Sequence, residues 1–140
     1  AIVGELAKIG MKGNLKWLDW GTSVSQANAG KLDGVWFRSW GNWMHDADNS
    51  LFTNCHSSAV YAKVWQGYKN EKLDKVLEEA RMTLDAAKRG KLYTEAQKIL
   101  QDDCPNLYAY AIQDIYAINK KVEWTPRTDE MIWYKEMSVV

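Results

Sequence analysis

The chain has 140 residues, which is enough for a single domain with a core of its own. Lysine plus arginine and aspartate plus glutamate number 18 each, so no net charge draws the chain to nucleic acid or to an anionic membrane. No apolar run approaches the roughly 20 residues of a transmembrane helix. Ala1 opens no signal-peptide pattern, and we expect the chain to start inside a helix of a longer protein.

The first quarter of the chain is predicted to alternate helix and strand. Apolar residues recur at helical spacing over residues 2–9, and residues 15–18 have the composition of a strand. Thr22 or Ser23 can cap a short helix that ends near Gly30, and residues 35–39 form a second predicted strand. Strand, helix and strand in this order predict parallel neighbours joined by a right-handed crossover, and therefore an α/β fold.

Two amphipathic helices are predicted in the second half. Asn70 is a good N-cap for an apolar stripe that runs to Leu84, and Asp85 can cap a second helix that ends at Cys104-Pro105. Residues 50–66 show no clean period and are predicted to form a loop with at most one helical turn. We expect the two helices to pack on the sheet.

Residues 107–118 alternate aromatic and aliphatic side chains and are predicted to form one bent strand or two short ones. Tyr108, Tyr110 and Tyr116 then share a face that either covers the sheet beneath the helices or lines a ligand cleft. Residues 119–140 form a tail whose path the sequence does not predict.

The loop after the predicted strand 35–39 carries the candidate ligand-binding residues, which are Trp40, Trp43, Asp46 and Asp48. In open α/β sheets, ligands bind in crevices at the carboxyl ends of strands. Each tryptophan can offer about 150–250 Å² of flat apolar surface to a ligand or to a partner protein. The alternative for the two aspartates is that they cap a turn or the following helix through backbone N–H groups.

Other chemistries fit these residues poorly. An EF-hand loop that opened at Asp46 would have Leu51 instead of glycine and Ser57 instead of glutamate at its key positions. Two aspartates two residues apart on a loop have no reason to flank a scissile bond. The two cysteines and two histidines lack the spacing of a zinc site, so we expect no metal and no cofactor.

Three stretches resemble the family 5 extracellular solute-binding proteins of bacterial ABC importers. Trp40 to Asn49 is similar to the family's W-x-x-x-x-x-D-P-D-N segment, with Ala47 in place of the proline. Gly67 to Tyr110 resembles its helix-pair signature, and Leu6 to Leu15 resembles its L-x-x-x-G-I-x-V-x-L stretch.

The resemblance implies that residues 1–140 are one domain, a portion of the second, C-terminal lobe of a two-lobed periplasmic-binding-protein-like (type II) fold, with a small mixed sheet and packed helices. It implies a binding protein and not an enzyme, which captures a solute against its N-terminal lobe and delivers it to a membrane permease. The expected location is the periplasm or, for a lipid-anchored form, the cell exterior. The alternatives are a hydrolase that uses Asp46 and Asp48, or a structural interaction domain that uses Trp40 and Trp43.

Two further expectations follow from the resemblance. Peptide-binding members of the family have an aspartate where this chain has Trp43, and that aspartate pairs with the α-amino group of the peptide. The expected solute is a peptide, as in the family, and the absence of this aspartate makes an oligosaccharide or another non-peptide solute the alternative, since a tryptophan suits the flat face of a sugar ring. Because the family is exported to oxidising compartments, Cys55 and Cys104 are candidates for a disulfide, with two free buried thiols as the alternative.

Overall fold

The computed structural model describes the backbone of residues 1–140 and all side chains except those of residues 64–66. The chain divides into two compact units, residues 1–34 and residues 35–140, and each is described on its own. Within the described residues, no helix is both long enough and apolar enough to cross a membrane.

The first unit contains two helices, α1 (Ile2–Lys8) and α2 (Trp20–Asn28). Gly10 follows α1 with φ of 82°, as predicted for the residue that ends a helix. The N-cap of α2 is Asp19, whose carboxylate accepts from the Thr22 N–H at 2.9 Å, so the helix starts earlier than predicted. The predicted strand at residues 15–18 is wrong, because this segment pairs with no other described segment.

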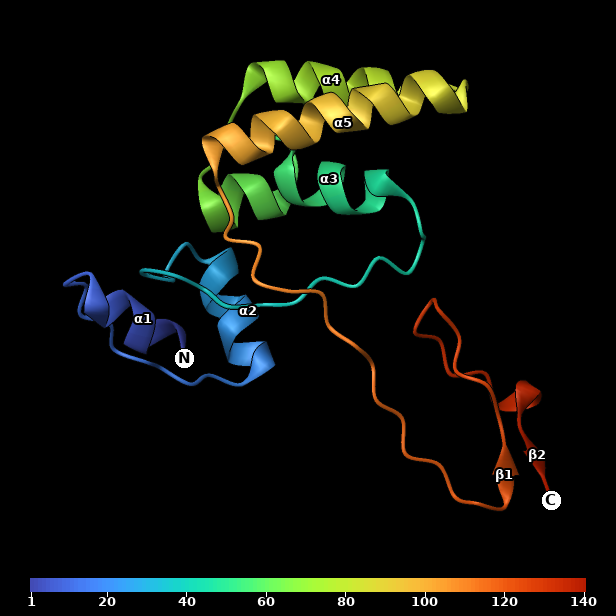
Figure 1. Cartoon of the computed structure of the whole chain (residues 1–140). Helices are drawn as coiled ribbons and strands as arrows, with labels where there is room; N and C mark the ends of the chain where they lie inside the picture. Colours follow the sequence, from blue (N-terminus) through green and yellow to red (C-terminus); the bar gives the residue numbers. More distant parts are fainter. The chain divides into compact units, whose positions relative to one another are not determined.

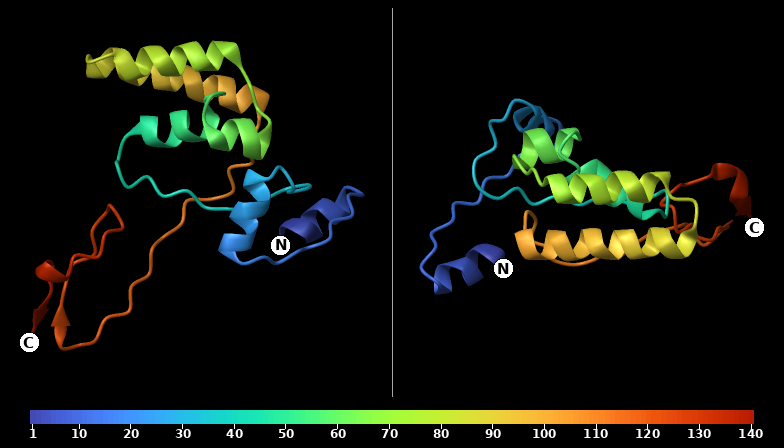
Figure 2. Two further views of the ribbon diagram at one scale, coloured as in Figure 1. Left: turned by 180° about the vertical axis from the view of Figure 1, so that it is seen from behind. Right: turned by 90° about the horizontal axis from the view of Figure 1, so that it is seen from above.

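The second unit is built around three packed helices. Helices α4 and α5 run antiparallel as a hairpin, and α3 packs against the hairpin (Figures 1 and 2). Their bounds and that of the short π-helix η1 are α3 Ala47–Cys55, η1 Tyr61–Gln66, α4 Glu71–Met82 and α5 Ala86–Asp103. The predicted α4 and α5 are confirmed almost to the residue.

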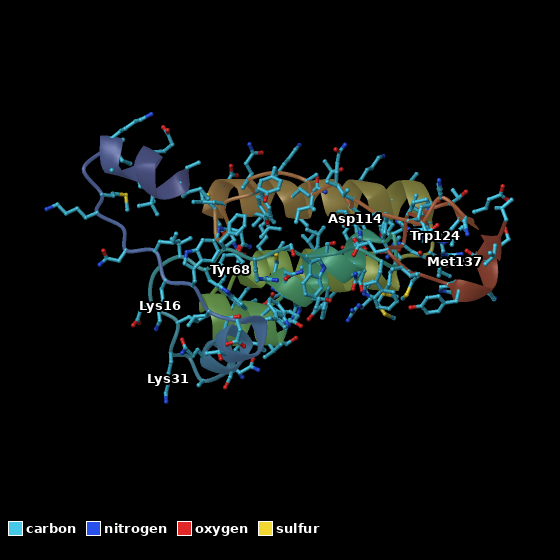
Figure 3. All side chains as sticks on the ribbon, turned by 90° about the horizontal axis from the view of Figure 1, so that it is seen from below. Lys16, Lys31, Tyr68, Asp114, Trp124 and Met137 are labelled. Atoms are coloured by element: carbon cyan, nitrogen blue, oxygen red, sulfur yellow. The ribbon has the colours of Figure 1, made fainter. Side chains whose placement is uncertain are left out.

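Side-chain caps and a polar clasp define the helical hairpin. The Asn70 side chain accepts from the N–H groups of Lys72 and Leu73, and the Asp85 carboxylate accepts from the next helix. Near the other end of α5, Asp103 accepts from the Tyr68 hydroxyl at 2.5 Å and from the Asn70 amide at 2.6 Å. Tyr68, labelled in Figure 3, therefore ties the chain just before α4 to the end of α5.

The core of this unit lies between α3, α4 and α5. Its buried members are Cys55, Leu73, Val76, Leu77, Ala80, Tyr93, Ala96, Ile99 and Leu100. Residues 73, 76, 77 and 80 recur at helical spacing, so burial of one stripe holds α4 in place. The expectation that the hairpin packs on a sheet is wrong, since the apolar face of the hairpin packs against α3 instead.

The prediction of a loop with at most one helical turn over residues 50–66 underestimates the helix content, because α3 continues to Cys55 and η1 follows at Tyr61–Gln66. Four of the nine residues of α3 are apolar, and these four, Ala47, Leu51, Phe52 and Cys55, belong to the core or pack against it. Only Asn54 and Cys55 of the helix are buried. A helix of nine residues shows only about two turns of such a pattern, which is too short for the period to stand out in the sequence, and its stability comes largely from packing and capping.

The predicted strands at 35–39 and 107–118 are also wrong, because neither segment forms a backbone ladder within the described residues. They do come close, since the rings of Phe37 and Tyr110 are 6.3 Å apart between centroids. Alternating side chains favour an extended backbone, but a strand also needs a neighbour about 4.8 Å away to complete its hydrogen bonds. Tyr108 and Tyr110 are exposed and cover no sheet.

The C-terminal tail folds back on itself. Strand β1 (Val122–Glu123) pairs antiparallel with β2 (Ser138–Val139), and the short 3₁₀-helix η2 (Tyr134–Glu136) precedes β2. Trp124 follows β1 and Met137 precedes β2, and both residues are labelled in Figure 3. The described structure is thus dominated by helices and contains one small antiparallel sheet, so it is compatible with the predicted α/β class because it contains both helices and strands. The mixed sheet, the type II fold and the assignment to the second lobe stay predictions.

We predict that Leu77→Ala destabilises the second unit by about 2–5 kcal/mol, because a fully buried leucine leaves a cavity between α4 and the helices around it. Leu84→Ala is the matched control, since Leu84 is 100% exposed between α4 and α5, and we expect a change within about 0.5 kcal/mol. Urea denaturation followed by helical circular dichroism measures both. Equal effects of the two substitutions would contradict the packing described here.

Candidate functional site

The candidate site is the segment that leads from Val35 into α3. It has two fixed ends, one at Arg38 and one at Asp46, and between them residues 40–45 form a loop with two exposed tryptophans. We refer to residues 40–45 as the tryptophan loop.

Arg38 fixes the first end of the loop. Its guanidinium carbon lies 5.9 Å from the ring centroid of Trp36, 5.6 Å from that of Trp40 and 5.4 Å from that of Tyr61. Its Nη2 also donates to Asn54 Oδ1 at 2.6 Å, which attaches the loop to α3. Burial lowers the pKa of Arg38, and the three rings around the guanidinium are a favourable surface for this cation.

Asp46 fixes the second end. It is the N-cap of α3, where its Oδ1 accepts from the Asp48 N–H at 2.8 Å. The same carboxylate accepts hydrogen bonds from both terminal nitrogens of Arg89 on α5, each at 2.7 Å. Arg89 also donates to the Tyr93 hydroxyl at 2.8 Å. The hydrogen bonds from Arg89, with help from the helix N-terminus, lower the pKa of Asp46.

Asp48 is engaged in a similar way by α4. Nε and Nη2 of Arg81 donate to its two oxygens at 2.8–3.3 Å, and the guanidinium lies 3.5 Å from the ring centroid of Phe52. Both aspartates that the sequence offered as ligand-binding groups therefore hold α3 against the helical hairpin. The capping alternative is confirmed for Asp46, and a contact of either residue with a solute stays a prediction.

The two tryptophans of the loop are accessible. Trp40 is 37% exposed and packs edge-on against Tyr61 at 5.1 Å between ring centroids, whereas Trp43 is 52% exposed. Trp40 thus has one side supported by protein, and Trp43 projects further. The two side chains offer apolar, planar surface on a loop whose ends are tied to α3 and α5 by hydrogen bonds, and a surface of this kind suits a ring or another flat group.

The C-terminal tail reaches the tryptophan loop. The Glu130 carboxylate lies so close to Gly41 that a Cβ built there would be 2.8 and 3.0 Å from its two oxygens. Thr128 Oγ1 lies 3.3 Å from His45 Nε2 at the other end of the loop. Residues far apart in the chain therefore share this site.

The predicted disulfide is not formed, since both cysteines are free in the structure. Cys55 is buried in the core, and burial raises the pKa of its thiol to about 11. The charge of nearby Arg38 and a hydrogen bond with Tyr108 lower this pKa, but by less than burial raises it. Cys104 is exposed at the end of α5, in a left-handed conformation with φ of 47°. The alternative of two buried thiols is therefore right for one residue only.

Sequence reasoning missed Arg81, Arg89 and Glu130. Each meets its partner across 33 residues or more of chain, and no local spacing indicates such pairs. Arg89 and Tyr93 do stand four apart on one helix face, which is the one local sign of the network around Asp46. In the part of the chain that the structure describes, no three His, Cys, Asp or Glu side chains gather as a metal site would require.

The chain is similar to bacterial binding proteins over most of its length. It is 32% identical over 101 residues to "Di/tripeptide-binding protein 1" of Pseudomonas aeruginosa (strain UCBPP-PA14), a match that covers 72% of this chain and 19% of that protein. "Dipeptide-binding protein" of Pseudomonas aeruginosa strain PAO1 is 31% identical over 104 residues, which is 74% of this chain and 19% of the relative.

A relative with a different ligand in its name matches the chain at a similar sequence identity. "Heme-binding protein A" of Haemophilus influenzae is 31% identical over 104 residues, covering 74% of this chain and 19% of that protein. The chain thus spans about a fifth of the length of these relatives. No model of a known protein family and no solved structure matches the chain.

We predict that one thiol reacts at once with a disulfide reagent such as DTNB in the native chain, and that the second reacts only after unfolding. Cys104 is exposed, whereas Cys55 is 2% exposed and its raised pKa keeps it as the unreactive thiol. Cys104→Ser should remove the fast phase alone. A chain without any reactive thiol after unfolding would show that the disulfide forms after all.

We predict that Asp46→Asn lowers the free energy of unfolding by about 1 kcal/mol at pH 7, since the pair with Arg89 is partly exposed. Asn can still cap α3, so the change isolates the charge. Because folding lowers the pKa of Asp46, the stabilisation is present above the unfolded pKa of about 3.9 and is lost as the pH falls through the lower folded pKa.

Urea denaturation at pH 7 and again near pH 2 measures this difference, which should shrink towards zero in acid. Asp114→Asn removes the same charge from an exposed position outside the helices and serves as the control. A difference that persists unchanged in acid would mean that the charge of Asp46 is not what stabilises the fold.

Proposed function

We propose that this chain, which belongs to the same family as the bacterial dipeptide- and tripeptide-binding proteins, supplies one wall of a solute-binding cleft. The observation that carries the proposal is the tryptophan loop. Its ends are held by Arg38 and Asp46, and Trp40 and Trp43 stay accessible between them. Rigid support with an exposed aromatic pair is the arrangement expected of a binding surface.

In the proposed role, the solute is enclosed between two lobes of a longer protein that close by a hinge motion. The captured solute is then delivered to the permease of an ABC importer, at the outer side of the membrane or in the periplasm. Residues 1–140 correspond to part of the second lobe in this proposal. By itself the chain binds weakly, because the contacts and the enclosure of the other lobe are missing.

The class of solute is also part of the proposal. Two named relatives bind peptides and one binds heme, so the family accommodates both flexible and flat solutes. The exposed indoles of Trp40 and Trp43 favour a solute with a planar or apolar face, which includes a peptide with an aromatic side chain, a sugar ring and a porphyrin.

Binding without turnover fits the site better than hydrolysis. A general acid or base needs a carboxylate that can exchange a proton with a substrate. Asp46 and Asp48 are instead each held by two nitrogens of an arginine, and the pKa of Asp46 is lowered by that bond. The names of the relatives describe binding proteins as well.

We predict that solutes perturb the indole N–H signals of Trp40 and Trp43 in ¹⁵N NMR spectra of the chain. Glycyl-phenylalanine, chitotriose and hemin are the three probes, one from each solute class. Trp43→Ala should weaken binding of the effective probe roughly tenfold, as expected for about 1.4 kcal/mol of lost aromatic contact. Trp17→Ala removes an indole that is 85% exposed outside the loop and should leave the affinity unchanged.

If none of the three probes shifts the two signals, the loop is not a solute-binding wall. Equal weakening by Trp17→Ala and Trp43→Ala would show non-specific adsorption to tryptophan, which also contradicts the proposal.

A further inference from the structure

His56 is a buried, ionisable side chain that lies outside the tryptophan loop. Three polar residues are buried among the described side chains, Ser23, Asn54 and His56, and of these only the histidine can change its charge near neutral pH. It follows α3 directly, is 6% exposed and stacks on the ring of Phe52, with 4.1 Å between centroids and 13° between planes. A charge that appears on this ring therefore appears inside the packed structure.

The contacts of the two ring nitrogens identify the neutral form of His56. The backbone N–H of Ser58 donates to Nδ1 at 3.1 Å, so this nitrogen carries no proton, and the Ser58 hydroxyl lies 2.7 Å from it. The proton of the neutral ring is then on Nε2, which lies 3.3 Å from an oxygen of Glu78 on α4. The neutral imidazole thus joins the turn after α3 to the helical hairpin.

The charged groups that face this ring come from α4. An oxygen of Asp74 lies 3.9 Å from Nε2, in addition to the closer oxygen of Glu78. Arg81 places its guanidinium carbon 3.5 Å from the centroid of the Phe52 ring on which the imidazole stacks. The two carboxylates attract a cationic ring, whereas burial and the nearby guanidinium oppose it.

A second proton on His56 changes the hydrogen bonds of the turn. Nδ1–H can donate to the Ser58 hydroxyl, but Nδ1 then no longer accepts from the Ser58 N–H, so this backbone donor loses its partner. The contact of Nε2 with Glu78 becomes charge-assisted at the same time. Ser57 is held separately, because its N–H and hydroxyl donate to Asp74 at 2.8 and 2.5 Å. The backbone therefore has to adjust on the side of Ser58.

The turn continues directly into η1 and towards the tryptophan loop. The His56 carbonyl accepts from the Ala59 N–H, and the Ala59 carbonyl accepts from the Lys63 N–H, both at 2.9 Å. The helix η1 begins at Tyr61, whose ring packs edge-on against Trp40 at 5.1 Å between centroids. A backbone shift in the turn therefore moves the ring that supports Trp40.

We propose that His56 is a pH-sensitive switch that couples its charge to the position of Trp40 in the tryptophan loop. With the ring neutral, the Ser58 N–H is bound and Tyr61 supports Trp40. With the ring charged, the turn rearranges and this support changes. The switch acts on the loop itself, so it goes beyond the proposed solute binding and does not depend on which solute the loop binds.

An NMR titration of the 140-residue chain between about pH 5 and pH 8 tests the proposal, because imidazoles change their charge in this range. The ring signals of His56, the backbone N–H of Ser58 and the indole N–H of Trp40 should titrate together with one midpoint. The chain has two histidines, and His45 lies in the tryptophan loop. Its own effect on Trp40 has to be removed by substitution.

Two matched variants separate the histidines. In His45→Gln the Ser58 and Trp40 signals should keep titrating with the ring of His56, whereas His56→Gln should abolish their titration. Glutamine keeps a donor and an acceptor but has no charge that changes with pH. Circular dichroism shows whether His56→Gln is folded. If it is not, the titration of His45→Gln decides alone, because His56 is then the only histidine left.

Four outcomes overturn the proposal. The first two are that His56 does not titrate in this range in His45→Gln, or that the Ser58 N–H does not follow it, so that the turn is insensitive to the charge. In the third, Ser58 follows but Trp40 does not, and the turn is then uncoupled from the loop. In the fourth, Trp40 still titrates in folded His56→Gln, which assigns its pH dependence to another group.

Discussion

The carboxylate of Asp46 joins three parts of the second unit. It caps α3, it receives both terminal nitrogens of Arg89 from α5, and it ends the tryptophan loop. Helix α3 has only nine residues, so its position depends on this cap and on the packing of Leu51, Phe52 and Cys55 against the hairpin. The loop in turn depends on α3, because both of its ends are attached there, through Asn54 at one end and Asp46 at the other.

Among the described side chains of this unit, the same physical arrangement occurs three times. In each case a guanidinium lies over an aromatic ring and also binds a carboxylate through two nitrogens. The three sets are Arg81 with Phe52 and Asp48, Arg89 with Tyr93 and Asp46, and Arg127 with Trp133 and Asp129. The planar fork of arginine makes both contacts at once, which lysine cannot do. Two of these sets hold α3 to the hairpin, and the third stabilises the tail that reaches the loop.

Homology and geometry support the proposed function from different sides. The relatives indicate a binding protein but match it through only about a fifth of their length, so they leave the surface that this chain contributes undefined. The geometry singles out a loop with supported aromatic side chains, and it pairs the neighbouring Asp46 and Asp48 with Arg89 and Arg81. The carboxylate that lies against the loop is that of Glu130, which is far in the sequence from the candidate ligand-binding residues at positions 40–48.

The helical hairpin, its caps at Asn70 and Asp85, and the tryptophans of the loop could all be predicted from the sequence alone. These features are local, since a 3.6-residue period, a capping side chain or a proline acts over a few residues. Tertiary contacts, by contrast, determine how far α3 extends, that residues 35–39 and 107–118 form no ladder, and that Asp46 pairs with Arg89. Such outcomes depend on a partner distant in the chain, and an isolated segment carries no information about which partner it will meet.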